Sequence, residues 1–455
     1  MKDKNIITDY KKVHFIGIGG VSVSALAEYA IANGISVSGS DIKASEFTNR
    51  LKNLGATISE GHCAKNVRGA ELVVYTVAID ENNCEFRYAK NKKLPLFTRS
   101  KFLGEIVNGY KNSVAVSGCH GKTTTSTMIA SVLTCAKKDP TLFLGGESYD
   151  FRNFRLGKSD FLVAEACEYK KSFLDIKPKI SVVLNIDDDH LDTYGNLEGV
   201  KKAFNQFIQG RIAVVNADDE NCTELCNPCM VTFGIKKTAN YYATDIKKDG
   251  DYYLFSLHAY SRRLGRVKLK TFGEHDIYNA LATFATCDLL GISFSFIKQG
   301  LENFNGVKRR NEYLGLRNGV KYYADYAHHP KEIRATLSAH LTGDARTLII
   351  FQPHTYSRTK LLLSEFIEVL KDKSPLIIYK TYPAREQYDE QGSASMLYKN
   401  LTKHGASGRY YAQNINELIR TIDQISCGVD KVLVLGAGDV YDKVKEIITT
   451  KAKKI

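Results

Sequence analysis

The sequence predicts an α/β protein built from three domains. Short runs rich in β-branched residues alternate with longer segments of 3.6-residue period, which is the pattern of parallel sheets covered by helices. The chain has 455 residues, and at roughly 150 residues per domain this length predicts about three domains, each able to bury its own core. Two predicted strands run straight into glycine-rich turns, so we expect ligands to bind where those strands end.

Composition and charge exclude several classes of protein. Hydrophobic residues make up 44% of the chain, as in an ordinary globular protein, and the net charge of +13 is spread along it without an arginine-rich arm. The longest apolar runs, such as residues 72–79 and 180–186, are far shorter than the roughly 18 residues of a membrane span. The N-terminus lacks the apolar segment of an export signal. We therefore expect a cytoplasmic protein that binds no nucleic acid and inserts into no membrane.

The ten cysteines are placed irregularly, as expected for reduced thiols. Cys222, Cys226 and Cys229 have the C-x3-C-x2-C spacing of an iron–sulfur ligand set and lie on a predicted helix. Because neither glycine-rich framing nor a fourth ligand accompanies them, we favour packed or partly exposed thiols over a cluster.

The first domain is expected to span residues 1–109. Its strand VHFIGIGG runs into glycines and is followed by the helical SVSALAEYAIANG and the strand ISVSGSD, which form one βαβ unit. Gly17, Gly19 and Gly20 would let the backbone approach an anionic ligand at the N-terminus of the helix. Asp41 ends the second strand, where such folds place an acceptor for a ribose hydroxyl. The pattern leaves open a dinucleotide, another diphosphate such as a nucleotide sugar, or a tight turn without ligand.

The second domain is expected to span residues 110–311 and to bind ATP. A strand runs into SGCHGKTTT, which opens a helix, as a phosphate-binding loop must. Lys122 would neutralise the β- and γ-phosphates, and the Thr123 hydroxyl would bind Mg²⁺. The loop reads G-x-x-G-K-T and is shorter than a full Walker A motif, since Val116 stands where that motif needs glycine.

Metal ligands for phosphoryl transfer should stand at strand ends on the same edge of the sheet. Glu165 ends the apolar strand of LVAEACE, and His190 follows the strand of VVLNIDDDHLD. Both are natural metal-ligand positions, although His190 could equally cap the next helix. Asp187, Asp188 and Asp189 are interpreted as solvated capping carboxylates.

The third domain, expected over residues 312–455, repeats the alternation of strands and helices. It begins at GVKYYADYAHHP and continues through the strands TLIIFQPH, PLIIYKTY and KVLVLGAGDV. Helices are predicted from Lys331 and from Arg358. The segment LENFNGVKRRNEYLG before this domain is interpreted as a linker.

Eight segments, in this order and over essentially the whole chain, resemble the Mur ligase family of peptidoglycan synthesis. They are HFIGIGG, GCHGKTTT, AEACE, NIDDDHLDTYG, GEHDIYNALA, FNGVKRRNE, DYAHHPKEI and FQPHTYSRT. The resemblance implies a Rossmann-like N-terminal domain for a UDP-sugar, a central ATPase domain of the P-loop type, and a Rossmann-like C-terminal domain for an amino acid.

The resemblance also implies a reaction, with ATP and Mg²⁺ as cofactors. The γ-phosphate of ATP would pass to the carboxylate of UDP-N-acetylmuramate, and the amine of L-alanine would attack the acyl phosphate to form an amide and release phosphate. The enzyme would contribute positioning and charge neutralisation. Related ligases that use glycine, serine or a recycled peptide as acceptor remain an alternative.

Site residues follow from the resemblance, position by position. Lys122, Glu165 and His190 would be catalytic, and Thr123, Glu165 and His190 would hold the metal. ATP would contact Gly118, Cys119, His120, Gly121, Lys122, Thr123, Thr124, Asn279, Arg310 and Asp325. The UDP-sugar would contact Gly17, Gly19, Gly20, Ser40, Asp41, Thr76 and Ala78. The amino acid would contact Tyr326, His328 and Arg358.

Three positions depart from the family pattern. Thr355 stands where an arginine is typical, so one cation of a pair is missing and selectivity for alanine becomes an open question. Ala324 replaces an acidic residue, and Cys167 stands where an aspartate is common.

Two other classes compete with a ligase. An NAD-dependent oxidoreductase would use the first βαβ unit, but it has no use for a separate GKTTT loop or a third α/β domain. A nucleotide-regulated binding protein without turnover would retain the loops. The sequence does not predict the oligomeric state.

Overall fold

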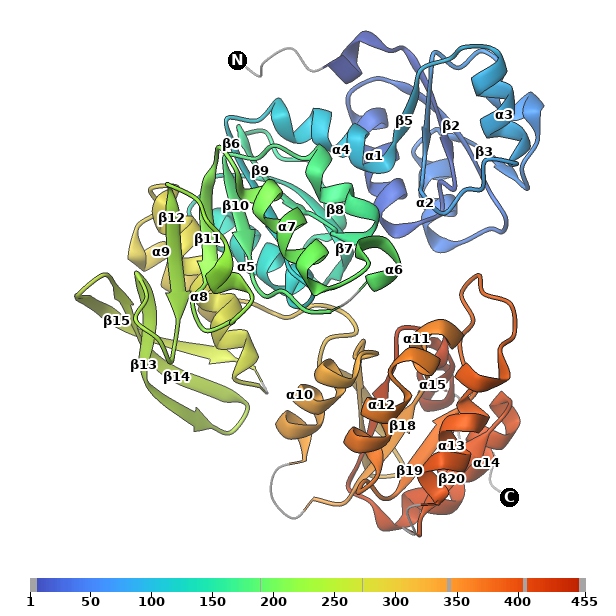
Figure 1. Ribbon diagram of the computed structural model, residues 1–455, viewed down its shortest axis with the longest axis vertical. Helices are drawn as coiled ribbons and strands as arrows, with labels where there is room; N and C mark the ends of the chain where they lie inside the picture. Colours follow the sequence, from blue (N-terminus) through green and yellow to red (C-terminus); the bar gives the residue numbers. More distant parts are fainter. Residues whose placement is uncertain (1–5, 189, 272, 342–344, 404–406, 450–455) are drawn as a thin grey trace. The chain divides into compact units, whose positions relative to one another are not determined.

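The computed structural model describes residues 6–188, 190–271, 273–341, 345–403 and 407–449 (Figure 1). They form three sheets with helices packed on them, so the predicted α/β class and its three sheet-containing parts are confirmed. The chain groups into two compact units and passes from one to the other between Val307 and Lys308, with Gly273 and Glu274 counted in the second.

The first sheet is parallel, with strand order β3-β2-β1-β4-β5. The order reverses beside β1, and at such a switch point ligands bind beyond the carboxyl ends of the strands. Its strands are β1 (Lys12–Ile16), β2 (Ser36–Asp41), β3 (Thr57–Glu60), β4 (Leu72–Tyr75) and β5 (Leu96–Thr98). Its helices are α1 (Val21–Ala32), α2 (Glu46–Asn53), α3 (Cys84–Asn91) and α4 (Arg99–Asn108).

The second sheet has the order β15-β14-β13-β12-β11-β10-β6-β9-β7-β8. The strands β7, β9, β6, β10, β11, β12 and β13 run parallel, and β8, β14 and β15 pair antiparallel with their neighbours. Its strands are β6 (Asn112–Ser117), β7 (Thr141–Ser148), β8 (Arg152–Arg155), β9 (Phe161–Glu165), β10 (Ile180–Val183), β11 (Ile212–Asn216), β12 (Met230–Gly234), β13 (Tyr241–Asp249), β14 (Tyr252–Ala259) and β15 (Arg262–Lys270). Its helices are α5 (Lys122–Cys135), α6 (Leu191–Tyr194), α7 (Leu197–Ile208), α8 (His275–Leu289) and α9 (Phe294–Glu302).

The third sheet has the order β16-β17-β21-β18-β19-β20, with only β16 antiparallel to its neighbour among the described strands. Its strands are β16 (Glu312–Arg317), β17 (Val320–Asp325), β18 (Thr347–Phe351), β19 (Leu376–Tyr379), β20 (Arg409–Ala412) and β21 (Lys431–Leu435). Its helices are α10 (Pro330–His340), α11 (Tyr356–Leu361), α12 (Leu363–Leu370), α13 (Ala394–Thr402), α14 (Ile415–Ile425) and α15 (Val440–Thr449).

Polar caps determine where several helices begin. The Ser45 side chain accepts from Thr48 N–H, and the Thr48 hydroxyl accepts from Ser45 N–H, so a capping box starts α2. Asn196 caps α7 in a similar way by accepting from Gly199 N–H. In α10, Pro330 occupies the first turn, where its missing N–H leaves no helical hydrogen bond unmade.

The first two sheets share one apolar core within the first unit. Tyr29 of α1 packs on Phe143 and Phe154, with ring centroids 5.7 and 6.3 Å apart. Asn153, which is buried, donates to Val21 O (2.7 Å) and accepts from Arg50 (2.8 Å). These contacts join the sheet of β1–β5 to the sheet of β6–β15.

One local prediction was wrong. The run that contains Cys222, Cys226 and Cys229 forms only a three-residue 3₁₀ turn, η4 (Cys222–Glu224), followed by irregular backbone. Pro228 disfavours a helical backbone at Asn227, and the Asn227 side chain donates to Arg211 O and to Ile208 O. In the parts of the chain that the structure describes, no set of three metal-binding side chains is found.

None of the described helices is both long enough and apolar enough to cross a membrane.

Candidate functional site

The phosphate loop connects β6 to α5 and is shaped by two glycines. Gly118 and Gly121 have φ of +135° and +85°, a backbone region that favours glycine. A Cβ at Gly121 would lie 2.5 Å from the Asn279 Oδ1 atom, so the close approach also requires glycine. The residues expected to contact ATP phosphates therefore lie at the N-terminus of a 14-residue helix, where free N–H groups attract anions.

The backbone that follows β10 holds this loop in place. His120 N–H donates to Asn185 Oδ1 (2.8 Å), and Asn185 Nδ2 donates back to His120 O (3.1 Å). Asp187 N–H donates to Cys119 Sγ (3.2 Å), and the Asp187 carboxylate lies 3.3 Å from His120 Nε2. Asp187 is thus part of the support for the loop and does more than the solvated cap that the sequence predicted. Asp189 lies outside the described residues.

Lys122 is paired with a carboxylate that the sequence analysis did not single out. Its ammonium lies 3.1 Å from each Glu168 oxygen and also donates to Gly118 O (2.5 Å) and Cys119 O (3.2 Å). Burial disfavours the charged ammonium, but the neighbouring Glu168 outweighs burial and raises the pKa of Lys122. The lysine is therefore cationic and already directed at the loop.

Glu168 also contacts residues that follow β10. His190 Nε2 lies 3.8 Å from Glu168 Oε1, and the His190 ring packs on Tyr169 with centroids 4.9 Å apart. The Tyr194 hydroxyl donates to Glu168 O. The structure thus brings His190 and Lys122 together around Glu168. The signal for Glu168 was present in the sequence, as the second glutamate of the quoted AEACE segment.

Glu165 and Thr123 lie against neighbouring residues of β7. Glu165 Oε1 accepts from Gly145 N–H (2.7 Å), and a Cβ at Gly145 would lie 2.8 Å from Glu165 Oε2. A Cβ at Gly146 would lie 3.7 Å from the Thr123 hydroxyl. Two oxygen donors of the expected metal set therefore face the same stretch of glycines.

Asn279 supports the phosphate loop from behind. It is buried on α8, accepts from Thr125 Oγ1 (3.1 Å) and donates to Asp276 Oδ1 (2.8 Å). This side chain packs against the loop glycine Gly121. Its expected contact with ATP stays a prediction.

The two thiols beside the loop are not activated. Burial, followed by the Glu168 charge, raises the pKa of Cys119 and of Cys167. Both thiols are protonated, so nucleophilic cysteine chemistry has no support here.

In the first sheet, the glycine turn is held by the end of β2. Gly17 and Ile18 N–H donate to Ser40 O (2.8 and 3.0 Å), and Gly19 N–H donates to Asp41 Oδ2 (2.8 Å). Asp41 therefore binds the turn itself, in addition to its expected role toward a ribose. A Cβ at Gly17 would lie 3.1 Å from the Thr76 side chain, so the turns after β1 and β4 lie side by side.

Behind Ser40 lies a buried carboxylate that the sequence analysis missed. Glu85 accepts from Ser40 Oγ (2.5 Å), Asn66 Nδ2 (2.7 Å) and Cys63 N–H (3.1 Å), and His14 Nε2 lies 3.6 Å away. Burial opposes its charge, but the nearby His14 and the hydrogen bonds from Ser40, Asn66 and Cys63 together outweigh burial and lower the pKa of Glu85 to about 2. No local pattern marks it, because its partners come from three separate segments.

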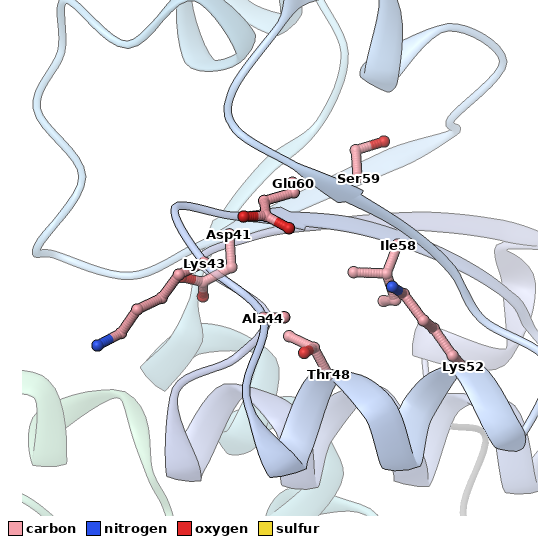
Figure 2. A pocket seen from close by; sticks show the side chains of 8 residues that line it. All are labelled: Asp41, Lys43, Ala44, Thr48, Lys52, Ile58, Ser59 and Glu60. Atoms are coloured by element: carbon pink, nitrogen blue, oxygen red, sulfur yellow. The ribbon is translucent and has the colours of Figure 1, made fainter.

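A small pocket opens beside Asp41, between the end of β2, helix α2 and β3 (Figure 2). Its walls carry both charges and hydroxyls, as a site for a polar ligand would. It is lined by Asp41, Lys43, Ala44, Thr48, Lys52, Ile58, Ser59 and Glu60.

The second unit places two arginines around Tyr326. The guanidinium groups of Arg309 and Arg310 lie 5.0 and 5.1 Å from the centre of its ring. Asp325, at the end of β17, is buried and accepts from Asn311 N–H and Ala327 N–H, both at 2.8 Å. Burial raises the pKa of Asp325, although Arg310 opposes the shift.

His328 and His354 form a neutral pair in the same unit. Their rings lie 5.7 Å apart, and the His354 ring stacks on Tyr382 at 5.5 Å. Burial lowers the pKa of His328 to about 3 and that of His354 to about 4, with the Arg358 charge adding to both shifts. Arg358 donates to His354 O (3.0 Å). The sequence analysis named His328 and Arg358 but missed His354, although it quoted the FQPH motif.

Thr355, which stands in place of the typical arginine, is bound to a glutamate. Its hydroxyl donates to Glu386 Oε1 (2.5 Å), and Ser357 N–H donates to Glu386 Oε2 (2.8 Å). The Ser357 hydroxyl also donates to Glu386.

Comparison with family models covers most of the chain. Residues 12–111 match the Mur ligase family, catalytic domain. Residues 116–287 match the Mur ligase middle domain, and residues 309–438 match the Mur ligase, glutamate ligase domain.

Individual proteins are similar over the same extent. The UDP-N-acetylmuramate--L-alanine ligase of Acetivibrio thermocellus is 42% identical over 445 residues, which cover 95% of this chain and 94% of that protein. The crystal structure of UDP-N-acetylmuramate-alanine ligase from Thermotoga maritima has a TM-score of 0.82 at 31% identity, covering 96% of this chain and 98% of that one. A murein peptide ligase from Psychrobacter arcticus shares the fold, with a TM-score of 0.72 at 22% identity over 98% of this chain and 99% of that one. The chain therefore belongs to the Mur ligase family.

Proposed function

We propose that this chain joins L-alanine to the carboxylate of UDP-N-acetylmuramate and uses ATP to activate that carboxylate. The observation that carries the proposal is the phosphate loop with its half-buried, cationic Lys122 at the start of α5. Relatives at about 40% identity over nearly the full chain bear the name of this reaction. The reaction belongs to peptidoglycan synthesis, and we expect it to take place in the cytoplasm.

The loop would hold ATP through backbone N–H groups and the Lys122 ammonium. A carboxylate is a poor electrophile, whereas an acyl phosphate reacts readily with an amine. Charge develops on the transferring phosphoryl group, and a fixed cation with aligned N–H donors stabilises it. Lys122 must exchange its contact with Glu168 for phosphate oxygens when ATP binds.

The residues present fit a bound Mg²⁺. Hard cations prefer oxygen, and Thr123 and Glu165 place a hydroxyl and a carboxylate beside the glycines of β7. His190 joins these candidates through its position next to Glu168. When bound, the ion would neutralise phosphate charge, and the protein needs to offer few ligands because phosphates and water supply the others.

The amino acid would bind to the second unit. Arg358 offers a cation for its carboxylate, and the neutral imidazoles of His328 and His354 can accept a hydrogen bond from its amine. Because Nδ1 of His328 faces Tyr326 O at 2.9 Å, it carries the proton and leaves Nε2 as the basic atom. Tyr326 would complete this site, and Arg310 with Asp325 would contact the nucleotide.

The UDP-sugar would bind to the first sheet. Its diphosphate would meet Gly17, Gly19 and Gly20 at the start of α1, and Ser40, Asp41, Thr76 and Ala78 would line the strand ends. We propose that three domains carry these three sites, over residues 1–109, 110–311 and 312–455.

Phosphate release is the direct test. Purified protein is incubated with ATP, Mg²⁺ and UDP-N-acetylmuramate, together with L-alanine, glycine, L-serine, D-glutamate or a muramyl-type peptide. We expect release with L-alanine to exceed release with every other acceptor. Preference for another acceptor would identify the protein as a Mur ligase with a different amino-acid or peptide substrate. Absence of phosphate release with all acceptors would overturn the proposal.

A further inference from the structure

The turn that carries the amino-acid residues is fastened at one end by an aromatic contact. This turn, defined as residues 353–358, follows β18 and includes the first three residues of α11, so that it contains both His354 and Arg358. Tyr382 N–H donates to Pro353 O (2.9 Å), and the Tyr382 ring stacks on His354 with an interplanar angle of 9°. The position of His354 therefore depends on the loop after β19.

Glu386, in the same loop, fastens the other end of the turn. Both of its carboxylate oxygens accept hydrogen bonds, from the hydroxyls of Thr355 and Ser357 and from Ser357 N–H. The N–H groups at the start of a helix lack partners within the helix, so this carboxylate also caps α11. Burial opposes its charge, but the bonds from Ser357 and Thr355 outweigh burial and lower the pKa of Glu386.

These bonds determine what the turn can present to a substrate. Because the hydroxyls of Thr355 and Ser357 point at Glu386, the turn offers the amino acid the guanidinium of Arg358 and the ring of His354. Arg358 in turn donates to His354 O, so its direction follows the backbone that Glu386 holds.

We propose that Glu386 is a positioning residue for the acceptor amino acid, acting through Thr355 and Ser357 on His354 and Arg358. This inference rests on the proposed function, since it assumes that the second unit binds the acceptor. The proposal also explains why a threonine can stand at position 355. Its hydroxyl donates a hydrogen bond to the Glu386 carboxylate.

The test is the E386Q variant, which keeps the shape but places an amide N–H₂ where one carboxylate oxygen accepts. The KM for the acceptor should rise about tenfold, because charge-assisted hydrogen bonds that hold the site are lost. The KM for ATP and the KM for UDP-N-acetylmuramate should stay within about twofold of wild type. E390Q, an exposed glutamate a few residues further on, is the matched control and should leave all three constants unchanged.

A double-mutant comparison separates positioning from general support. If Glu386 acts through Thr355, T355V should raise the same KM, and T355V with E386Q should raise it by less than the product of the single effects. An acceptor KM within twofold of wild type in E386Q would overturn the proposal. So would an equal rise of all three KM values together with a lower melting temperature.

The panel of acceptors distinguishes a failure of this inference from a failure of the proposed function. The variants are compared on whichever acceptor the wild-type protein uses best. A wild type that prefers glycine would correct the proposed function and leave the role of Glu386 testable on glycine. A wild type that uses no acceptor would overturn both.

Discussion

Lys122 and Glu168 face one another at the loop where we propose that the nucleotide phosphates bind. A lysine whose side chain is only 17% exposed needs a counter-charge, and Glu168 supplies it at 3.1 Å. A bound phosphate and Glu168 would therefore compete for one ammonium group. Glu168 keeps Lys122 charged and directed at the loop, but it lowers the net gain from binding a phosphate.

This competition predicts the behaviour of E168Q. The amide carries no charge, so Lys122 should attract phosphate more strongly, and ADP measured without Mg²⁺ should bind about fivefold more tightly. Isothermal titration calorimetry measures the affinity, with E220Q on an exposed loop as control. Weaker binding in E168Q would show that the glutamate supports the loop more than it competes.

The half-buried histidines His328 and His354 predict a loss of stability in weak acid. Their pKa values are about 3 for His328 and about 4 for His354, below the 6.5 of a free imidazole. The unfolded chain therefore binds more protons below pH 6.5, so stability falls as the pH drops from 6.5 toward 4. In H354Q the fall in melting temperature between pH 7 and pH 5 should be about 2 °C smaller than in wild type.

The matched control is H275Q, which changes an exposed histidine. It should keep the full acid sensitivity of the wild-type protein. An H354Q curve parallel to wild type would contradict the assignment of His354 as a neutral group with a lowered pKa.

At the scale of elements, α5 and α9 approach too closely for a side chain between them. A Cβ at Gly300 would lie 2.4 Å from Val132 Cα and 2.7 Å from Val132 N, both backbone atoms that cannot rotate away. The Ser131 hydroxyl donates to Gly300 O (2.9 Å) across the same contact. Since α5 begins at Lys122, this packing also fixes the helix that carries the phosphate loop.

G300A should therefore destabilise the protein by about 1–3 kcal/mol, because the two helices must move apart. Thermal or urea unfolding measures the change, and K298A on the exposed face of α9 is the control. A G300A protein as stable as wild type would mean that the two helices can move apart without any loss of stability.

The elements that the sequence predicted well are those marked by a local pattern. The strand ends at Gly17, Gly118 and Glu165 follow from apolar runs that stop at a glycine or a carboxylate. The strands β13, β14 and β15 were not predicted. Charged residues interrupt β13 and β15, so neither strand contains a continuous apolar run. Glu85 was missed for another reason, because its partners come from segments that only folding brings together. Glu168 was present in the quoted AEACE segment, but its pairing with Lys122 also depends on folding.

At the scale of the whole molecule, the second unit has the parts of an independent domain. Its six-stranded sheet and its two apolar clusters are formed entirely by residues after Val307. A fragment of residues 308–455 should therefore fold alone and melt in one cooperative transition. Circular dichroism against temperature measures this, and a broad transition without a baseline would contradict it.

The shared core of the first unit has a consequence for how such proteins can be recombined. Tyr29 belongs to the N-terminal sheet layer, whereas Phe143 and Phe154 belong to the next one, and the three rings pack as one cluster. A chimaera that exchanged residues 1–109 with those of a distant relative would replace one side of this cluster and keep the other. Residues 1–109 are therefore best exchanged together with the sheet that follows them, and the joint suited to a crossover lies at residues 307–308, where the chain enters its second unit.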